Sequence, residues 1–111
     1  MPETRCMKIK LKPNALPRVR QWAAEINRRR DEALETLRDE SVTLESVFLD
    51  STPEGDFLIY FMKADDFAGA QEAARRSVRA IDAYHREFKR ETWDGGTQLE
   101  LLIDLERLTE V

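Results

Sequence analysis

Residues 41–64 decide the fold, and they read SVTLESVFLDSTPEGDFLIYFMKA. Residues 41–50 alternate between two faces, which is the period of a strand, and residues 57–64 are rich in the aromatic and branched side chains that strands prefer. Between them, Pro53 and Gly55 supply the fixed and the permissive backbone angles of a turn. Because the connection is short, we expect the two strands to form an antiparallel hairpin.

The segments before the hairpin predict a strand and a helix. Residues 5–12 read RCMKIKLK, in which apolar residues alternate with lysines as in a half-buried strand. Residues 14–40 carry an apolar stripe at helical spacing and predict one long helix. Asn14 is expected to cap this helix, and Pro17 is tolerated in its first turn.

The segments after the hairpin predict a second helix and a last strand. The two aspartates at residues 65–66 offer a cap for the helix. A weak break near residues 77–80 precedes residues 81–93, which form either a second helix or a bent continuation of the first. Asp-Gly-Gly at residues 94–96 ends it. Residues 97–106 alternate again, so we expect the fourth strand there.

The predicted order is strand, helix, strand, strand, helix, strand, which is the βαββαβ plan of the ferredoxin-like α+β fold. Right-handed crossovers place the first and third strands in the centre of a four-stranded antiparallel sheet, with both helices on one face. The length predicts a single domain, residues 1–111, with its core between about residues 5 and 106.

The two faces of this sheet are expected to differ in what covers them. The residues expected to face the helices are Met7, Ile9, Leu11, Leu44, Phe48, Ile59, Phe61, Leu101 and Ile103. The residues expected on the opposite face are Lys8, Lys10, Glu45, Val47, Leu49, Leu58, Tyr60, Met62, Glu100, Leu102 and Asp104. An apolar patch of that size usually marks a partner surface, so we expect a homodimer through the exposed sheet face.

Composition excludes several classes of protein. The net charge of −4 argues against nucleic acid as a partner, since phosphate binding needs an excess of basic residues. No apolar run approaches the 18 or so residues of a membrane helix. Cys6 is the only cysteine, which favours a reducing cytoplasm, and one cysteine with one histidine is too few for a protein-bound zinc. We expect no metal and no cofactor.

Residues 81–93, IDAYHREFKRETW, contain the best candidates for a site. His85 has Asp82 one helical turn before it, an arrangement that can orient the ring as a general acid or base. Tyr84 and Trp93 add a hydroxyl and an indole N–H, each on an aromatic ring. The alternative is a histidine at the rim of the core that bonds Asp82 or a backbone carbonyl.

Three further residues are candidates for ligand binding. Tyr60 can offer a hydroxyl, although such tyrosines are more often anchors at the edge of a core. Glu45 would need a raised pKa to act in catalysis, which only burial or a nearby like charge supplies. Arg30 can bind an anion or simply lay its stem over the core.

Two segments carry a family resemblance: the hairpin with VFLD at residues 47–50 and LIYF at residues 58–61, and IDAYHREFKR at residues 81–90. With them, residues 7–105 resemble a family of small bacterial proteins classed as a domain of unknown function. The resemblance implies the dimeric α+β barrel superfamily and assigns no activity. Other branches of that superfamily include monooxygenases, haem-degrading enzymes and sugar mutarotases, which often use a pocket between helices and sheet.

Three functions remain open from the sequence. The first is a small-molecule-binding homodimer with a pocket between sheet and helices. The second is a cofactor-independent enzyme of monooxygenase or isomerase type in which His85 transfers a proton. The third is an interaction module whose exposed sheet face serves only to dimerise.

Overall fold

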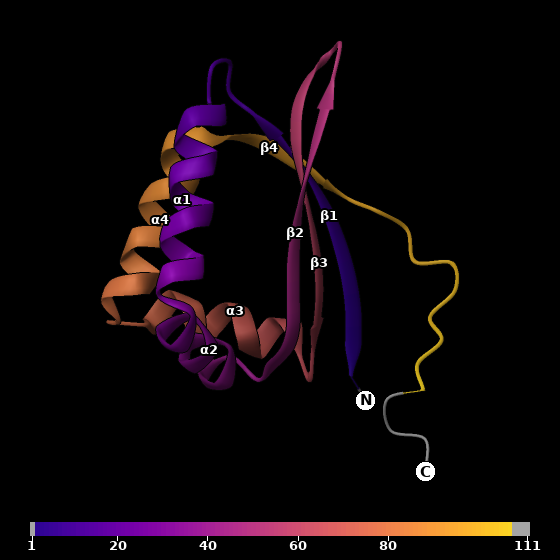
Figure 1. Cartoon of the computed structure of the whole chain (residues 1–111). Helices are drawn as coiled ribbons and strands as arrows, with labels where there is room; N and C mark the ends of the chain where they lie inside the picture. The colour runs from indigo at the N-terminus through magenta and orange to yellow at the C-terminus, as the bar shows by residue number, and fades with distance from the viewer. Residues whose placement is uncertain (1, 108–111) are drawn as a thin grey trace.

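The chain folds into a four-stranded antiparallel sheet with helices packed on it, as seen in a computed structural model that describes residues 2–107 (Figure 1). In chain order the elements are β1 (Glu3–Leu11), α1 (Leu16–Arg28), α2 (Arg30–Asp39), β2 (Val42–Thr52), β3 (Gly55–Ala64), α3 (Phe67–Arg76), α4 (Ala80–Thr92) and β4 (Trp93–Gln98). The strand order is β2-β3-β1-β4, and each neighbouring pair is antiparallel. The predicted α+β sheet with the first and third strands in its centre is confirmed. The ends of the predicted domain, residues 1 and 108–111, lie outside the described residues.

All four helices lie on the same side of the sheet (Figure 1). There α1 packs beside α4, and α2 packs beside α3. Within residues 2–107, no helix combines the length and the apolar character needed to cross a lipid bilayer.

The helix expected over residues 14–40 is two helices, because the backbone leaves helical geometry at Arg29, with φ −100° and ψ 37°. Neither a glycine nor a proline marks this break. The expected cap at Asn14 is wrong: Asn14 has a φ of 63°, and Ala15 precedes α1 without a capping side-chain bond. Pro17 does lie in the first turn, as expected.

The second helical region, where the sequence left a break or a bend open, breaks at residues 77–79 between α3 and α4. Asp66 rather than Asp65 caps α3, since its carboxylate accepts hydrogen bonds from the backbone N–H groups of Ala68 and Gly69. Of the two alternatives, the structure therefore has a second helix and not a bent continuation.

The face assignment predicted for β2 and β3 is wrong. Leu58 and Tyr60 are 1% and 4% exposed beneath the helices, whereas Phe48 is 60% exposed on the outer face. Both alternating sets of these strands are apolar, so alternation told which residues share a face but not which face is buried. A register shift between Val42 and Leu44 further reverses the alternation within β2. The inner face carries Met7, Ile9, Leu11, Glu45, Val47, Leu58, Tyr60 and Met62.

The last strand lies earlier than predicted, at Trp93–Gln98 instead of residues 97–106. Gly96, one of the glycines expected to end the helix, pairs with Ile9 of β1. A Cβ on Gly96 would lie 2.7 Å from Cδ1 of Ile9, so a larger residue would displace the Ile9 side chain. Residues 99–107 continue beyond β4 without regular strand structure, on the side of the sheet away from the helices (Figure 1). Leu99 still donates a backbone hydrogen bond to Cys6, and Asp104 accepts one from the Thr4 hydroxyl. The leucines and isoleucine of this segment are exposed.

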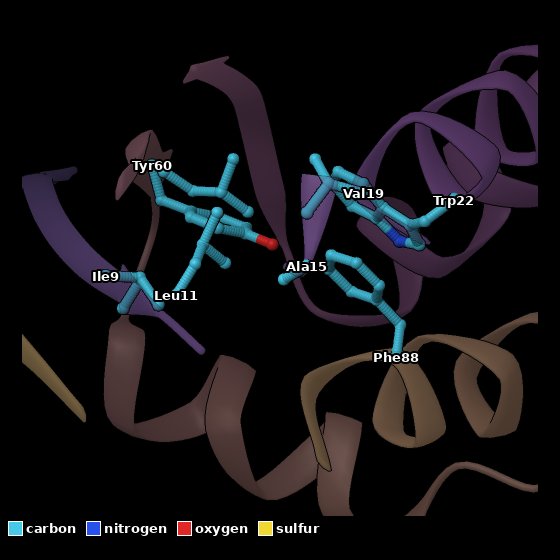
Figure 2. Close-up of a cluster of buried hydrophobic side chains, with 8 residues drawn as sticks. Ile9, Leu11, Ala15, Val19, Trp22, Tyr60 and Phe88 are labelled. Atoms are coloured by element: carbon cyan, nitrogen blue, oxygen red, sulfur yellow. The ribbon is translucent and has the colours of Figure 1, made fainter. Parts of the chain in front are cut away.

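The main core lies between the sheet and the α1–α4 pair (Figure 2). Phe88 is fully buried and stacks on Trp22, with ring centroids 4.3 Å apart and an interplanar angle of 4°. At the end of α4, the chain enters β4 without a loop. There Thr92 is 1% exposed, and its carbonyl accepts a hydrogen bond from the backbone N–H of Lys12 at 2.8 Å. This junction fixes α4 against the sheet.

Candidate functional site

A cavity of about 500 Å³ lies between the inner face of the sheet and the helices, chiefly α1, α2 and α4. Small-ligand pockets occupy roughly 300–1,000 Å³, so the volume suits a small molecule. Much of its wall is apolar, including Met7, Ile26, Leu34, Val47, Met62 and Ile81. Its ionisable lining includes Arg5, Arg30, Glu40, Glu45, Asp82, His85, Arg86 and Lys89.

The β2–β3 register places two polar groups on the sheet side of the cavity. Val47 pairs with Tyr60, and Glu45 pairs with Met62. Glu45 and Tyr60 are therefore diagonal neighbours on the inner face, at the about 7–8 Å separation of such positions. Each side chain lies within the electrostatic reach of the other.

Helical periodicity places three polar groups on the opposite side. Asp82, His85 and Lys89 recur at steps of three and four along α4, so they share one face of this helix, and all three line the cavity. The buried Ile81 and Phe88 dock the same helix on the core. The cavity is thus bounded by a rigid sheet and a rigid helix.

His85 is held by Trp22. The indole Nε1 of Trp22 donates a hydrogen bond to Nδ1 of His85 at 3.1 Å. Burial and the nearby Lys89 ammonium lower the pKa of His85 to about 3. The ring is therefore neutral at physiological pH and carries its proton on Nε2, which makes that nitrogen a hydrogen-bond donor.

Asp82 does not orient His85, which corrects the predicted pair. Its carboxylate instead accepts a hydrogen bond from the hydroxyl of Ser77, in the link between α3 and α4. The Ser77 hydroxyl also accepts from the backbone N–H of Arg79. Asp82 thus helps to fix the start of α4 while lining the cavity.

Tyr60 and Trp93 carry the two buried polar atoms that lack a partner. Their rings meet edge to face, with centroids 5.3 Å apart. Within residues 2–107, neither Oη of Tyr60 nor Nε1 of Trp93 makes a hydrogen bond of good geometry, although Trp93 lies close enough to the Tyr60 hydroxyl to oppose the rise of its pKa. Both side chains line the cavity. Burial, followed by the charge of Glu45, raises the pKa of the Tyr60 hydroxyl, so it remains protonated. Figure 2 shows this hydroxyl pointing from the sheet toward the helices that carry Trp22 and Phe88.

Three buried or half-buried charges share the cavity. Burial raises the pKa of Glu45, against the opposing effect of Lys89. Burial and the charges of Asp82 and Glu45 raise the pKa of Glu40 to about 7. Burial also lowers the pKa of Lys89, whose ammonium lies 4.8 Å from the ring centroid of Trp93. The cavity therefore contains carboxyl groups that hold protons more tightly than carboxyls in water.

Tyr84 and Arg30 differ in their relation to the cavity. Tyr84 lies outside it, on the α1 side of α4, where its hydroxyl accepts a hydrogen bond from Arg18 at 3.2 Å. Arg30 is exposed and also lines the cavity, which places it at the rim. The other predicted ligand-binding residues, His85, Asp82, Tyr60, Glu45 and Trp93, lie together around the cavity.

Sequence reasoning missed Trp22, Glu40 and Lys89 as lining residues. Lys89 had a usable signal, because it follows His85 by four residues and so shares its helix face. Trp22 belonged to an apolar stripe and was interpreted only as core. Nothing in the local sequence separates Glu40 from the other charges of α2.

Potential metal ligands do not cluster in the part of the chain that the structure describes. Within residues 2–107, no three His, Cys, Asp or Glu side chains are grouped closely enough to hold an ion.

Comparison with known proteins places the chain in a family. A search of curated proteins found no significant match. A solved structure described as "Structure of Rv0793 from Mycobacterium tuberculosis" aligns with 96% of this chain and 100% of the other, with a TM-score of 0.56 and 15% identity. At this identity the likeness concerns the fold alone. A family model matches residues 2–110, in agreement with the resemblance carried by the hairpin and α4, and the chain belongs to the family of unknown function DUF6176.

Proposed function

We propose that the chain is a homodimer in which each subunit binds a small molecule in the cavity between sheet and helices. The main support for ligand binding is the pair of buried groups without a hydrogen bond of good geometry, Oη of Tyr60 and Nε1 of Trp93. Leaving a buried polar group without a partner costs about 1–3 kcal/mol. A ligand atom that accepts from both groups removes this cost on binding.

The lining defines the chemistry of such a ligand. Apolar side chains such as Ile26 and Met62 suit an apolar body, and Tyr60, Trp93 and His85 present hydrogen-bond donors. The ligand therefore carries an acceptor oxygen or nitrogen at one end of an apolar or aromatic frame.

The outer face of the sheet supports the homodimer. We assign the chain to the ferredoxin-like fold and the dimeric α+β barrel superfamily, and the strand order β2-β3-β1-β4 agrees with that assignment. Phe48, Phe61 and Leu101 are 60%, 38% and 54% exposed. A second copy would cover these side chains, since an exposed apolar patch usually marks a partner surface.

The ligand proposal is tested by removing the unpartnered hydroxyl. We expect Tyr60→Phe to raise the free energy of unfolding of the ligand-free protein, because the buried polar group disappears without loss of packing. The same variant should bind less well any compound that stabilises the wild type in a thermal-shift screen of carbonyl and phenol compounds. Native mass spectrometry of the purified protein would show whether a ligand is retained.

Tyr84→Phe is the matched control, since the Tyr84 hydroxyl already accepts from Arg18 outside the cavity. This variant should leave ligand binding unchanged and should not gain stability. Equal behaviour of the two variants would contradict the pocket. If the protein is instead an interaction module that binds no ligand, the two variants should behave alike.

The enzyme alternative is favoured by one observation, the raised pKa values of Glu40 and Glu45 at the cavity. Perturbed carboxyls in a cavity are typical of acid–base sites. His85 is a poorer choice for taking up a proton, because the Trp22 bond occupies the lone pair of Nδ1. We also propose a cytoplasmic location, which the lone Cys6 supports.

A further inference from the structure

Glu45 faces the cavity as a carboxylate that no protein group satisfies. It lines the cavity from β2 and, within residues 2–107, makes no hydrogen bond and no close ion pair. The helix-surface carboxylates of Glu25 and Glu32, by contrast, are paired with Arg28 and Arg29. Burial raises the pKa of Glu45, so its carboxylate is a stronger base than one in water.

Hydrogen-bond donors line the cavity on its sheet side and on its helix side. Tyr60 is the diagonal neighbour of Glu45 on the inner sheet face, and its hydroxyl lacks an acceptor. Trp93 Nε1 interacts only weakly with the Tyr60 hydroxyl and makes no hydrogen bond of good geometry within residues 2–107. The ring of His85, whose Nε2 carries its proton, is on the helix side, 6.5 Å from that of Tyr60 between centroids. These donors can stabilise negative charge on a ligand oxygen.

We infer that the cavity catalyses enolisation of a small ketone or related carbonyl compound with an apolar or aromatic body. In this reaction Glu45 is the base, and Tyr60 and Trp93 bind the carbonyl oxygen. The inference rests on the proposed small-molecule pocket and adds a reaction class and residue roles to it.

The step needs no cofactor. The Glu45 carboxylate removes a proton from the carbon next to the carbonyl, and the C–H electron pair becomes the C=C bond of the enolate. The π pair of the C=O bond moves onto oxygen, which accepts hydrogen bonds from Tyr60 and Trp93. The protonated Glu45 exchanges its proton with water and returns one to carbon, so the net result in heavy water is exchange of hydrogen for deuterium.

Lys89 has a supporting role in this arrangement. Its ammonium lies close enough to lower the pKa of Glu45 somewhat, yet it makes no ion pair with this residue among the described contacts. Lys89 therefore opposes the rise in the pKa of Glu45 and leaves the lone pairs of the carboxyl free. Glu40, at the C-terminal end of α2, is only half-buried and is the less suitable base.

The test uses 2-tetralone, an uncharged bicyclic ketone, in heavy water. Loss of its α-hydrogen signal is followed by NMR, and binding is followed by quenching of tryptophan fluorescence. We expect the full-length protein to accelerate exchange at least tenfold over buffer, and Glu45→Gln to lower the enzymatic rate by about 10²–10⁴-fold while binding persists. Tyr60→Phe should lower the rate by about 10²–10³-fold.

Glu54→Gln, in the exposed β2–β3 turn, is the matched control and should keep the full rate. A thermal melt of each variant checks that it is folded. Binding of 2-tetralone without exchange, or exchange that survives Glu45→Gln, overturns the catalytic inference and leaves the pocket standing. If 2-tetralone neither binds nor exchanges, the catalytic inference is also overturned. The stability of Tyr60→Phe relative to wild type then tests the small-molecule pocket separately.

Discussion

Trp22 and His85 join α1 to α4 through a hydrogen bond from indole Nε1 to imidazole Nδ1, 3.1 Å long. Since this bond uses the lone pair that would accept a proton, and burial opposes a charge, we expect His85 to remain neutral between pH 5 and 8. The chain has one histidine, so a single ring signal in NMR reports it without ambiguity. Trp22→Phe should move the pKa of His85 upward, toward 6.5.

Lys89→Met offers a second check on the same prediction, because the Lys89 ammonium also disfavours a charged His85. A wild-type ring that titrates near pH 6.5 would contradict the burial of His85. Arg90→Met, on the exposed side of α4, should leave the titration unchanged.

Phe88 is expected to be a main contributor to stability. It is fully buried and stacks on Trp22, so Phe88→Ala leaves a large cavity and should lower the free energy of unfolding by about 3–5 kcal/mol. Urea unfolding followed by circular dichroism measures this loss. Val78→Ala, at a side chain 98% exposed, should change it by no more than about 0.5 kcal/mol.

Asp66 is expected to stabilise α3 through its cap. Asp66→Ala removes the acceptor of the backbone N–H groups of Ala68 and Gly69, and should cost about 1 kcal/mol in thermal or urea unfolding. Asp65→Ala changes a neighbouring carboxylate of the same charge without touching the cap. If both variants lose the same stability, net charge and not capping is responsible.

Glu40 gives the folded protein a pH dependence of known sign. Its pKa is about 7 in the fold and 4.5 in the unfolded chain, so between these values the folded state holds the extra proton. The contribution of Glu40 to the free energy of unfolding is therefore present at pH 5 and decreases as the pH rises through 7. Because the carboxyl is half-exposed and screened by water, we expect a decrease of about 1 kcal/mol.

Glu40→Gln should abolish this part of the pH dependence. The free energy of unfolding of the variant should therefore increase relative to that of the wild type as the pH rises from 5 to 8. The comparison is made by urea unfolding at each pH. A difference that grows in the opposite direction would show that Glu40 is stabilised as a charge, through Lys89.

The homodimer is tested on the outer face of the sheet. Phe48→Glu puts a charge into the proposed interface, and light scattering at micromolar concentration should change from the mass of two chains to that of one. Val78→Glu adds the same charge away from that face and should leave the dimer intact. If the wild-type protein has the mass of one chain, the homodimer proposal is wrong.

Element order was predictable from sequence because it depends on local patterns. The hairpin turn at residues 53–55 and the alternation of β1 set the strands, and the break near Ser77 was visible. The break at Arg29 was not, because no glycine or proline causes it and the contacts of α2 with β2 and α3 come from distant residues. The antiparallel sheet followed from order and short connections.

The site was only partly predictable for a related reason. Glu45 and Tyr60 were assigned to one face, and the β2–β3 pairing places them there. Which face of β3 the helices cover depended on the β1–β3 register, which pairs Met7 with Tyr60 and which no local pattern reveals. The partner of His85 was Trp22, 63 residues earlier, and such a contact is a product of packing.

The loop-free junction of α4 and β4 limits how relatives of this chain can vary in length. Trp93 follows Thr92 directly, and the Thr92 carbonyl is bonded to Lys12, so an inserted residue there would move Trp93 out of the cavity. The turn at Pro53 and Glu54 is exposed and far less constrained. Insertions, epitope tags and permuted termini should therefore be accepted at that turn and rejected at the junction.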